Sequence, residues 1–201
     1  MRYLIVCGGK TDKEFGLNEI KTDGIDAIIA ADSGMDFLYE NGVTPDIIVG
    51  DFDSATTKAL EFFERKGQTE IHRLNPIKDD TDTEYAIRLA IREGARSIVM
   101  LGATGSRMDH VLGNISLLGI GLQSETDISI IDINNRIRMA DKPVTIEKSA
   151  QYGRFVSLIA VTDDNEVSLR GFKYPVTDYS FDRFTSVSYT HLRAHETRGN
   201  L

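Results

Sequence analysis

The chain has 201 residues, 41% of them hydrophobic, so it is long enough to bury a core in one large or two small domains. Its formal net charge of −8 argues against duplex nucleic acid or an anionic membrane as the main partner. Because Cys7 is the one cysteine, an internal disulfide and a cysteine-cluster zinc site are both excluded.

The N-terminal sequence predicts neither a membrane span nor a secretion signal. No apolar run in the sequence approaches the length of a span, and the first run, at residues 3–6, is broken early by Gly8 and Gly9. We therefore expect a cytoplasmic protein. Cys7, at the end of that apolar run, is expected to be a small buried residue and not a nucleophile.

The first half of the chain alternates short apolar runs with helical patterns. The runs are almost continuously apolar, as in parallel strands covered on both faces, and they lie at residues 3–6, 27–30, 47–49 and 98–101. The clearest helix spans residues 81–93, with a capping box of Thr81 and Glu84 and with Gly94 at its end. A second helix is expected at about residues 108–118. This alternation predicts an open α/β sheet whose ligands bind beyond the carboxyl ends of the strands.

From about residue 127 the pattern becomes β-rich, with strands expected at residues 128–133, 144–146, 155–161 and 166–169. Polar turns separate these runs, and no helical pattern lies between them. We therefore expect an α/β domain over residues 1–125 and a small antiparallel β domain over residues 126–186, with the boundary at residues 123–126.

Residues 187–201 fit neither domain pattern. The string from residue 187 to residue 197 resembles translated sequencing-library adapter, so residues 187–201 are left out of the fold prediction as a non-native tail. His191 and His195 are four residues apart, as in some metal sites, but no third ligand accompanies them, and we expect no metal there.

Two acidic motifs lie where ligands are expected. The sequence GDFDS at residues 50–54 follows a predicted strand, and in an extended segment Asp51 and Asp53 project the same way. The sequence KDDTD at residues 78–82 leads into the first predicted helix. Paired carboxylates repel unless a cation lies between them, and magnesium takes such ligands together with substrate phosphates. The alternative is an Asp-rich surface turn.

A glycine loop with a basic residue, GATGSRMDH at residues 102–110, joins a predicted strand to the second helix. Glycines let the backbone approach phosphate, and Arg107 adds a planar donor for phosphate oxygens. A glycine pattern alone is weak, because turn geometry also requires glycines. His110 is expected to be an orienting or packing residue more often than a base.

Four motifs in order resemble the thiamine pyrophosphokinase family: DSG at 32–34, PD at 45–46 with GDFDS at 50–54, KDDTDTE at 78–84, and residues 102–110 with Asn114. The likeness is dense over residues 1–120 and weaker through GFKYP at 171–175. It implies an α/β catalytic domain, a β-sandwich domain, a homodimer with thiamine bound between subunits, and transfer of pyrophosphate from ATP to thiamine with release of AMP.

The resemblance also implies roles for individual residues. Three aspartates would hold Mg²⁺, directly or through water: Asp51, Asp53 and Asp82. Asp79 would be a further ligand or the acceptor of the thiamine hydroxyl proton, and Asp32 would line the same cleft. Three residues would hold the nucleotide: Arg107, Asp109 and Asn114.

One departure from the family pattern leaves alternatives open. Further strands with a Ser-Asn segment normally complete the thiamine pocket, and residues 187–201 stand in their place, so we expect an incomplete β-sandwich. A metal-dependent phosphoesterase named for an Asp-His-His signature is the second reading, with His72 and His110 as its candidate ligands before the tail. The third is a non-catalytic nucleotide-binding module.

Overall fold

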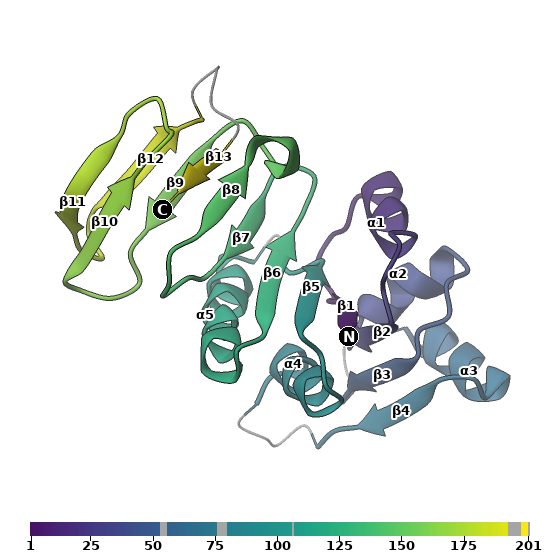
Figure 1. Ribbon diagram of the computed structural model, residues 1–201. Helices are drawn as coiled ribbons and strands as arrows, with labels where there is room; N and C mark the ends of the chain where they lie inside the picture. Colours follow the sequence, from purple (N-terminus) through teal and green to yellow (C-terminus); the bar gives the residue numbers. More distant parts are fainter. Residues whose placement is uncertain (53–55, 76–79, 106, 193–197, 201) are drawn as a thin grey trace. The chain divides into compact units, whose positions relative to one another are not determined.

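The structure, a computed structural model, describes residues 1–52, 56–75, 80–105, 107–192 and 198–200, without the side chains of residues 57 and 188–190. The chain forms two compact units, Met1–Met139 and Ala140–Leu201 (Figure 1). Each unit is described by itself below.

The first unit is an open α/β sheet with the strand order β4-β3-β2-β1-β5-β6-β7. Its strands are β1 (Arg2–Val6), β2 (Ala27–Ala31), β3 (Ile47–Gly50), β4 (Glu70–Arg73), β5 (Ser97–Leu101), β6 (Asp127–Ile131) and β7 (Arg136–Arg138). The first six are parallel to their neighbours, and β7 is antiparallel to β6. The strand order reverses between β1 and β5, and in open α/β sheets ligands bind at such a switch point. The predicted fold class is therefore confirmed.

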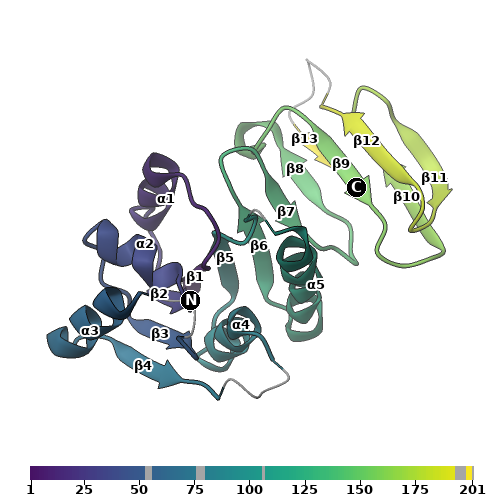
Figure 2. The same ribbon diagram turned by 180° about the vertical axis from the view of Figure 1, so that it is seen from behind.

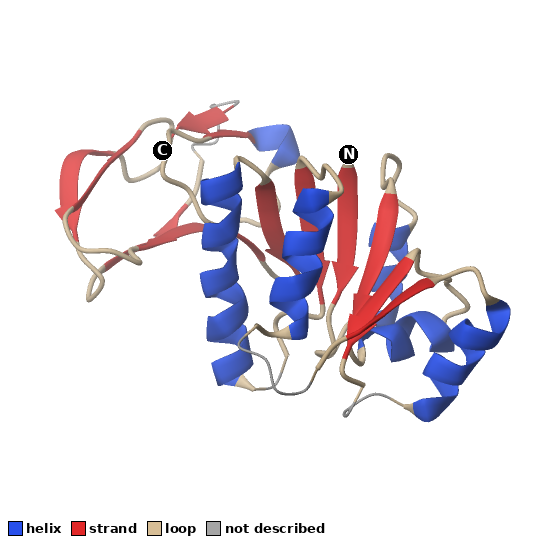
Figure 3. Cartoon of the chain, turned by 90° about the horizontal axis from the view of Figure 1, so that it is seen from below, coloured by secondary structure: helices blue, strands red, loops and turns tan. Residues whose placement is uncertain are grey.

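Five helices connect these strands: α1 (Lys13–Ile20), α2 (Gly34–Glu40), α3 (Thr57–Lys66), α4 (Asp82–Arg92) and α5 (Met108–Ser124). Helices α4 and α5 lie side by side on one face of the sheet (Figure 3), and α1, α2 and α3 lie on the other side (Figure 2). In the part of the chain that the structure describes, no helix has both the length and the apolar character needed to cross a membrane.

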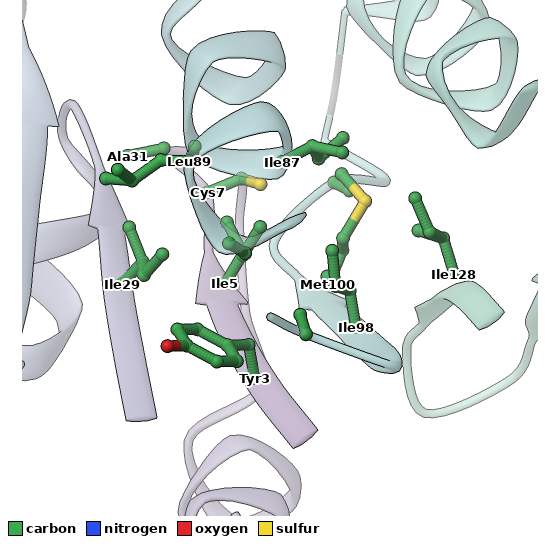
Figure 4. Packing of buried hydrophobic residues seen from close by; sticks show 14 of the residues in the cluster. Tyr3, Ile5, Cys7, Ile29, Ala31, Ile87, Leu89, Ile98, Met100 and Ile128 are labelled. Carbon is green, nitrogen blue, oxygen red and sulfur yellow. The ribbon is translucent and has the colours of Figure 1, made fainter. Parts of the chain in front are cut away.

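Burial on both faces explains why the strands are almost continuously apolar. Side chains alternate along β1, so Tyr3, Ile5 and the following Cys7 share the face that α4 covers (Figure 4). Leu4 and Val6, which point the other way, are also buried. Helix α4 packs one stripe into this core, and its members are Ala86, Ile87, Leu89 and Ala90.

The boundary between the units differs from the sequence prediction. We expected the β domain to begin at residue 126, but β6 (Asp127–Ile131) pairs in parallel with β5 and belongs to the first sheet, and the first unit extends to Met139. Four of the five β6 residues are buried, as both-face coverage requires. Helix α5 likewise continues past the predicted end at 118, to Ser124.

The described residues of the second unit form three antiparallel strand pairs. Strand β8 (Thr145–Glu147) pairs with β13 (Arg198–Asn200), β9 (Val156–Ile159) with β12 (Ser186–Thr190), and β10 (Asn165–Leu169) with β11 (Val176–Phe181). A short 3-10 helix, η1 (Lys148–Ala150), follows β8. Leu169, Phe172 and Leu192 form the buried centre of this unit.

The described residues after 186, which are 187–192 and 198–200, take part in the second unit, although the sequence prediction left them out of the fold. Strands β12 and β13 both contribute ladder hydrogen bonds to the second unit. Leu192 is 5% exposed and bridges to Phe172, and Val187 packs against the same centre. Apolar residues at these positions give the stretch a face to bury, and adjacent strand edges give it partners.

Candidate active site

Three carboxylates from separate segments meet at the carboxyl edge of the first sheet. Asp32 follows β2, Asp51 follows β3, and Asp82 begins α4. One carboxylate oxygen from each lies within 4.8 Å of the other two, and all three residues are partly buried. Oxygens on opposite sides of an octahedral magnesium are about 4 Å apart, so the cluster has the dimensions of a divalent-cation site.

The cluster brings together two of the predicted metal ligands, Asp51 and Asp82, and adds Asp32, which was expected only to line the cleft. Asp53 and Asp79 lie outside the described residues. Among the residues that the structure describes, no histidine belongs to a candidate metal cluster. His72 instead contacts Glu70 at 2.6 Å and the Tyr85 hydroxyl at 3.2 Å.

Left-handed backbone turns place the first two aspartates. Asp32 has φ 48° and Phe52 has φ 63°, a conformation that costs a residue with a side chain about 1–2 kcal/mol. The amide of Asp32 donates to the carbonyl of Val49 at 2.7 Å, which joins the ends of β2 and β3. The Arg73 guanidinium lies over the Phe52 ring, 5.4 Å from its centroid. Strained turns of this kind are typical of functional sites.

The start of α4 places the third aspartate. The Thr81 side chain caps the helix by accepting from the amide of Glu84 at 3.1 Å, as the sequence predicted. The Glu84 carboxylate does not complete the capping box in this structure but pairs with Arg88. Asp82 is in the first turn, where the helix dipole favours a negative charge.

Two glycine loops meet beside this cluster, at the switch point between β1 and β5. The amide of Gly9, in the loop after β1, donates to the carbonyl of Gly102 at 2.9 Å. Gly102 has φ 67°, a conformation that favours glycine. The loop at residues 102–105 therefore lies against the first glycine loop, and no side chain separates the two backbones where Gly9 meets Gly102 and Gly105.

The three predicted nucleotide residues follow this loop. Arg107 and Asp109 are exposed and form a two-point ion pair, with Nε–Oδ1 and Nη2–Oδ2 distances of 3.2 and 2.5 Å. The hydrogen bond between them raises the pKa of Arg107 and lowers the pKa of Asp109. Asn114, on α5, donates to the carbonyl of Ala103 at 2.9 Å, so it supports the loop. His110 is exposed in the first turn of α5.

Sequence reasoning missed one polar pair at this edge. Thr104 donates its hydroxyl hydrogen to Asp132 Oδ2 at 2.8 Å, linking the loops after β5 and β6. The available signal was position, because Asp132 directly follows a buried strand just as Asp32 and Asp51 do. The misplaced domain boundary hid this pattern.

Comparison with known proteins gives consistent matches over both units. A family described as "Thiamin pyrophosphokinase, catalytic domain" matches residues 21–130, and "Thiamin pyrophosphokinase, vitamin B1 binding domain" matches residues 143–190. The thiamine pyrophosphokinase of Bacillus subtilis (strain 168) is 36% identical over 152 residues, covering 75% of this chain and 70% of that protein.

Solved structures agree. The crystal structure of thiamine pyrophosphokinase from Bacillus subtilis superposes with a TM-score of 0.84 at 29% identity, covering all of this chain and 92% of the other. The enzyme from Geobacillus thermodenitrificans gives a TM-score of 0.83 at 29% identity, with 100% and 91% covered. The matched catalytic range contains every candidate residue from Asp32 to Asn114.

Proposed function

Because the chain belongs to the thiamine pyrophosphokinase family, we propose that the edge described above is the active site of an ATP-dependent pyrophosphoryl transferase. The reaction transfers the terminal pyrophosphate of ATP to the hydroxyl of thiamine and gives thiamine diphosphate and AMP. The observation that carries the proposal is the convergence of Asp32, Asp51 and Asp82 beside the two glycine loops.

The metal in this proposal is Mg²⁺, held by Asp32, Asp51 and Asp82. Three partly buried carboxylates form a hard, oxygen-only donor set, which suits magnesium better than a softer metal. Asp53 and Asp79 lie outside the described residues and keep their predicted roles in this proposal. Asp53 is a further magnesium ligand, and Asp79 is another ligand or the acceptor of the thiamine hydroxyl proton. Bound magnesium supplies neutralisation of the charge on the phosphate oxygens.

The protein groups position the reactants. The amides of the glycine loops and the Arg107 guanidinium would hold phosphate oxygens, and Asn114 would keep the second loop in place through Ala103. The thiamine hydroxyl oxygen then bonds to the β-phosphorus of ATP, the bond from that phosphorus to the α–β bridging oxygen breaks, and AMP leaves. Such a transfer needs in-line positioning and charge neutralisation more than covalent help. Asp109 holds the Arg107 side chain at the loop.

A cytoplasmic homodimer with thiamine bound between subunits completes the proposal. Its support is the family membership together with six exposed large hydrophobic side chains among the described residues of the second unit: Phe155, Ile159, Val161, Tyr174, Tyr179 and Phe184. Sedimentation equilibrium at micromolar concentration tests the dimer, and a monomer throughout the concentration range contradicts it.

One assay tests the function. The protein is incubated with ATP, Mg²⁺ and thiamine, and products are separated by chromatography. We expect AMP and thiamine diphosphate in equal amounts, with neither formed when thiamine or Mg²⁺ is left out. Phosphate release that does not depend on thiamine would indicate the phosphoesterase instead. ATP binding without turnover would indicate a binding module.

A further inference from the structure

A polar contact outside the three-aspartate cluster joins the loops after two adjacent strands. The Thr104 hydroxyl, from the loop after β5, donates to Asp132 Oδ2 at 2.8 Å. Both residues are partly buried. The family assignment does not require this pair, and the proposed reaction has not used Asp132.

Asp132 is held rigidly from its own side. Its Oδ1 accepts from the amides of Asn134 and Asn135 at 2.7 and 2.8 Å, and the Asn135 side-chain amide reaches both carboxylate oxygens at 3.0 and 3.1 Å. The Asp132 amide donates to the carbonyl of Asn135 at 2.9 Å, which closes the turn. A carboxylate fixed by this many donors offers Thr104 an acceptor in one defined position.

The charge state favours a strong contact. Burial by itself raises the pKa of the Asp132 carboxyl, but hydrogen bonds from Asn134, Thr104 and Asn135 together hold that pKa below its ordinary value. The carboxylate is therefore ionised at neutral pH. A hydrogen bond to an ionised acceptor is stronger than one between neutral groups.

The contact completes the support of the glycine loop. Gly102 is held by the amide of Gly9, and Ala103 by the side-chain amide of Asn114. Thr104 is held by Asp132, so three consecutive loop residues are each held by a different element. Arg107, the proposed phosphate ligand, is three residues further on.

We propose that Asp132 is a positioning residue of the nucleotide loop, which it fixes through the Thr104 hydroxyl without touching the substrate. This inference rests on the proposed function, because it assigns the loop to ATP. A loop ordered before ATP binds avoids the entropy cost of ordering it on binding. Loss of the contact should weaken ATP binding equally in the ground and transition states, raising KM for ATP while leaving kcat and KM for thiamine nearly unchanged.

The test compares Thr104→Val, which removes the hydroxyl at almost constant shape, with Thr104→Ser, which keeps it. Thr104→Val should raise KM for ATP about tenfold, the size of one lost hydrogen bond to a charged group, and Thr104→Ser should restore most of it. In an Asp132→Ala background the further effect of Thr104→Val should vanish, as in a double-mutant cycle between coupled residues. The matched control is Thr69→Val, which removes a hydroxyl bonded to the Pro45 carbonyl at 2.8 Å, away from the loop.

Hydrogen exchange of the amides of residues 102–105 in the ligand-free protein gives a reading independent of turnover. Exchange there should be faster in Thr104→Val and unchanged in Thr69→Val. Unchanged exchange in Thr104→Val overturns the inference, and so does faster exchange with an unchanged KM for ATP. If the wild-type protein has no pyrophosphokinase activity, the proposed function fails. Amide hydrogen exchange and a calorimetric titration with ATP, compared between the wild type and Thr104→Val, still decide whether Asp132 fixes an ATP-binding loop.

Discussion

A methyl group on Gly9 would lie 2.2 Å from the carbonyl oxygen of Gly102 and 3.1 Å from the Cα of Gly105. All the obstructing atoms are backbone, so no side chain can rotate away to make room. The loops after β1 and β5 are therefore too close together for a side chain at Gly9, and the switch point depends on its absence.

Gly9→Ala should destabilise the first unit by about 1–3 kcal/mol, the usual cost of forcing extra volume into a packed site, and should weaken ATP binding. Thermal unfolding and calorimetric ATP titration measure the two effects. Gly113→Ala is the matched control, because a methyl group at this α5 position meets nothing within 4 Å and should stabilise the helix by about 0.5–1 kcal/mol. Equal behaviour of the two variants would contradict the packing argument.

Asp51→Asn should remove most of the stabilisation that Mg²⁺ confers. A ligand at a hundred times its Kd stabilises the folded state by about 2.7 kcal/mol, and losing one of three carboxylates lowers that affinity steeply. Without Mg²⁺ the variant should unfold at the same temperature as the wild type or slightly higher, since a repulsion is relieved. Calorimetric scans with Mg²⁺ and with EDTA test both statements. Asp23→Asn, an equal charge change in an exposed turn, should respond to Mg²⁺ as the wild type does.

Arg107→Lys should keep the fold and lower kcat/KM for ATP by about tenfold or more. Arg107 is exposed, so little packing is lost, but lysine cannot make the planar two-point contact with a phosphate. Steady-state kinetics at saturating thiamine is the measurement. Arg138→Lys is the matched control. It weakens an exposed ion pair with Asp127, between β7 and β6, and should leave kcat/KM for ATP unchanged. An unaltered value for Arg107→Lys would remove Arg107 from the nucleotide site.

Cys7 should resist alkylation in the folded protein. Burial raises the pKa of its thiol to about 12, against which the Thr83 hydroxyl 3.9 Å from Sγ acts only weakly, so almost no thiolate exists at pH 8. Iodoacetamide labelling followed by mass spectrometry should show slow reaction in buffer and rapid reaction in guanidinium chloride. Because the folded-state pKa is raised, this group's contribution to the free energy of unfolding is fully present below the ordinary thiol pKa near 9. It is lost as pH rises from there to about 12.

Local signals predicted the elements whose own residues mark where they begin and end. Helix α4 was expected at residues 81–93 and spans Asp82–Arg92, because its cap, its apolar stripe and the left-handed Gly94 that follows it are all local signals. Strand β4 was not predicted, since only Ile71 of its four residues is a large apolar residue. The β6 run reads the same in a parallel or an antiparallel strand, and its pairing with β5, distant in sequence, decides between them.

In the candidate site, too, contacts between segments distant in sequence could not be predicted from local signals. The prediction that Asp51 and Asp82 lie close together rested on the order of the motifs and on the family resemblance. No local signal relates a residue at a strand end to one at the start of a later helix. The Thr104–Asp132 contact joins positions 28 residues apart and needs the strand order to be seen. Residues 187–201 were left out of the fold prediction because they resemble adapter sequence. That resemblance does not indicate whether Leu192 is buried in a hydrophobic core.

Helix α4 holds Asp82 in its first turn and packs Ala86, Ile87 and Ala90 into the core within the following two turns. A packed helix moves as a rigid body, since interiors are as dense as crystals and a single added methylene displaces neighbours. A volume change under α4 would therefore tilt the helix and shift a carboxylate of the cluster without altering any residue that faces the ligand. If the cluster binds magnesium as proposed, thermostabilising designs that repack this core would also change its cation selectivity, because magnesium tolerates little deviation from octahedral geometry and calcium tolerates much more.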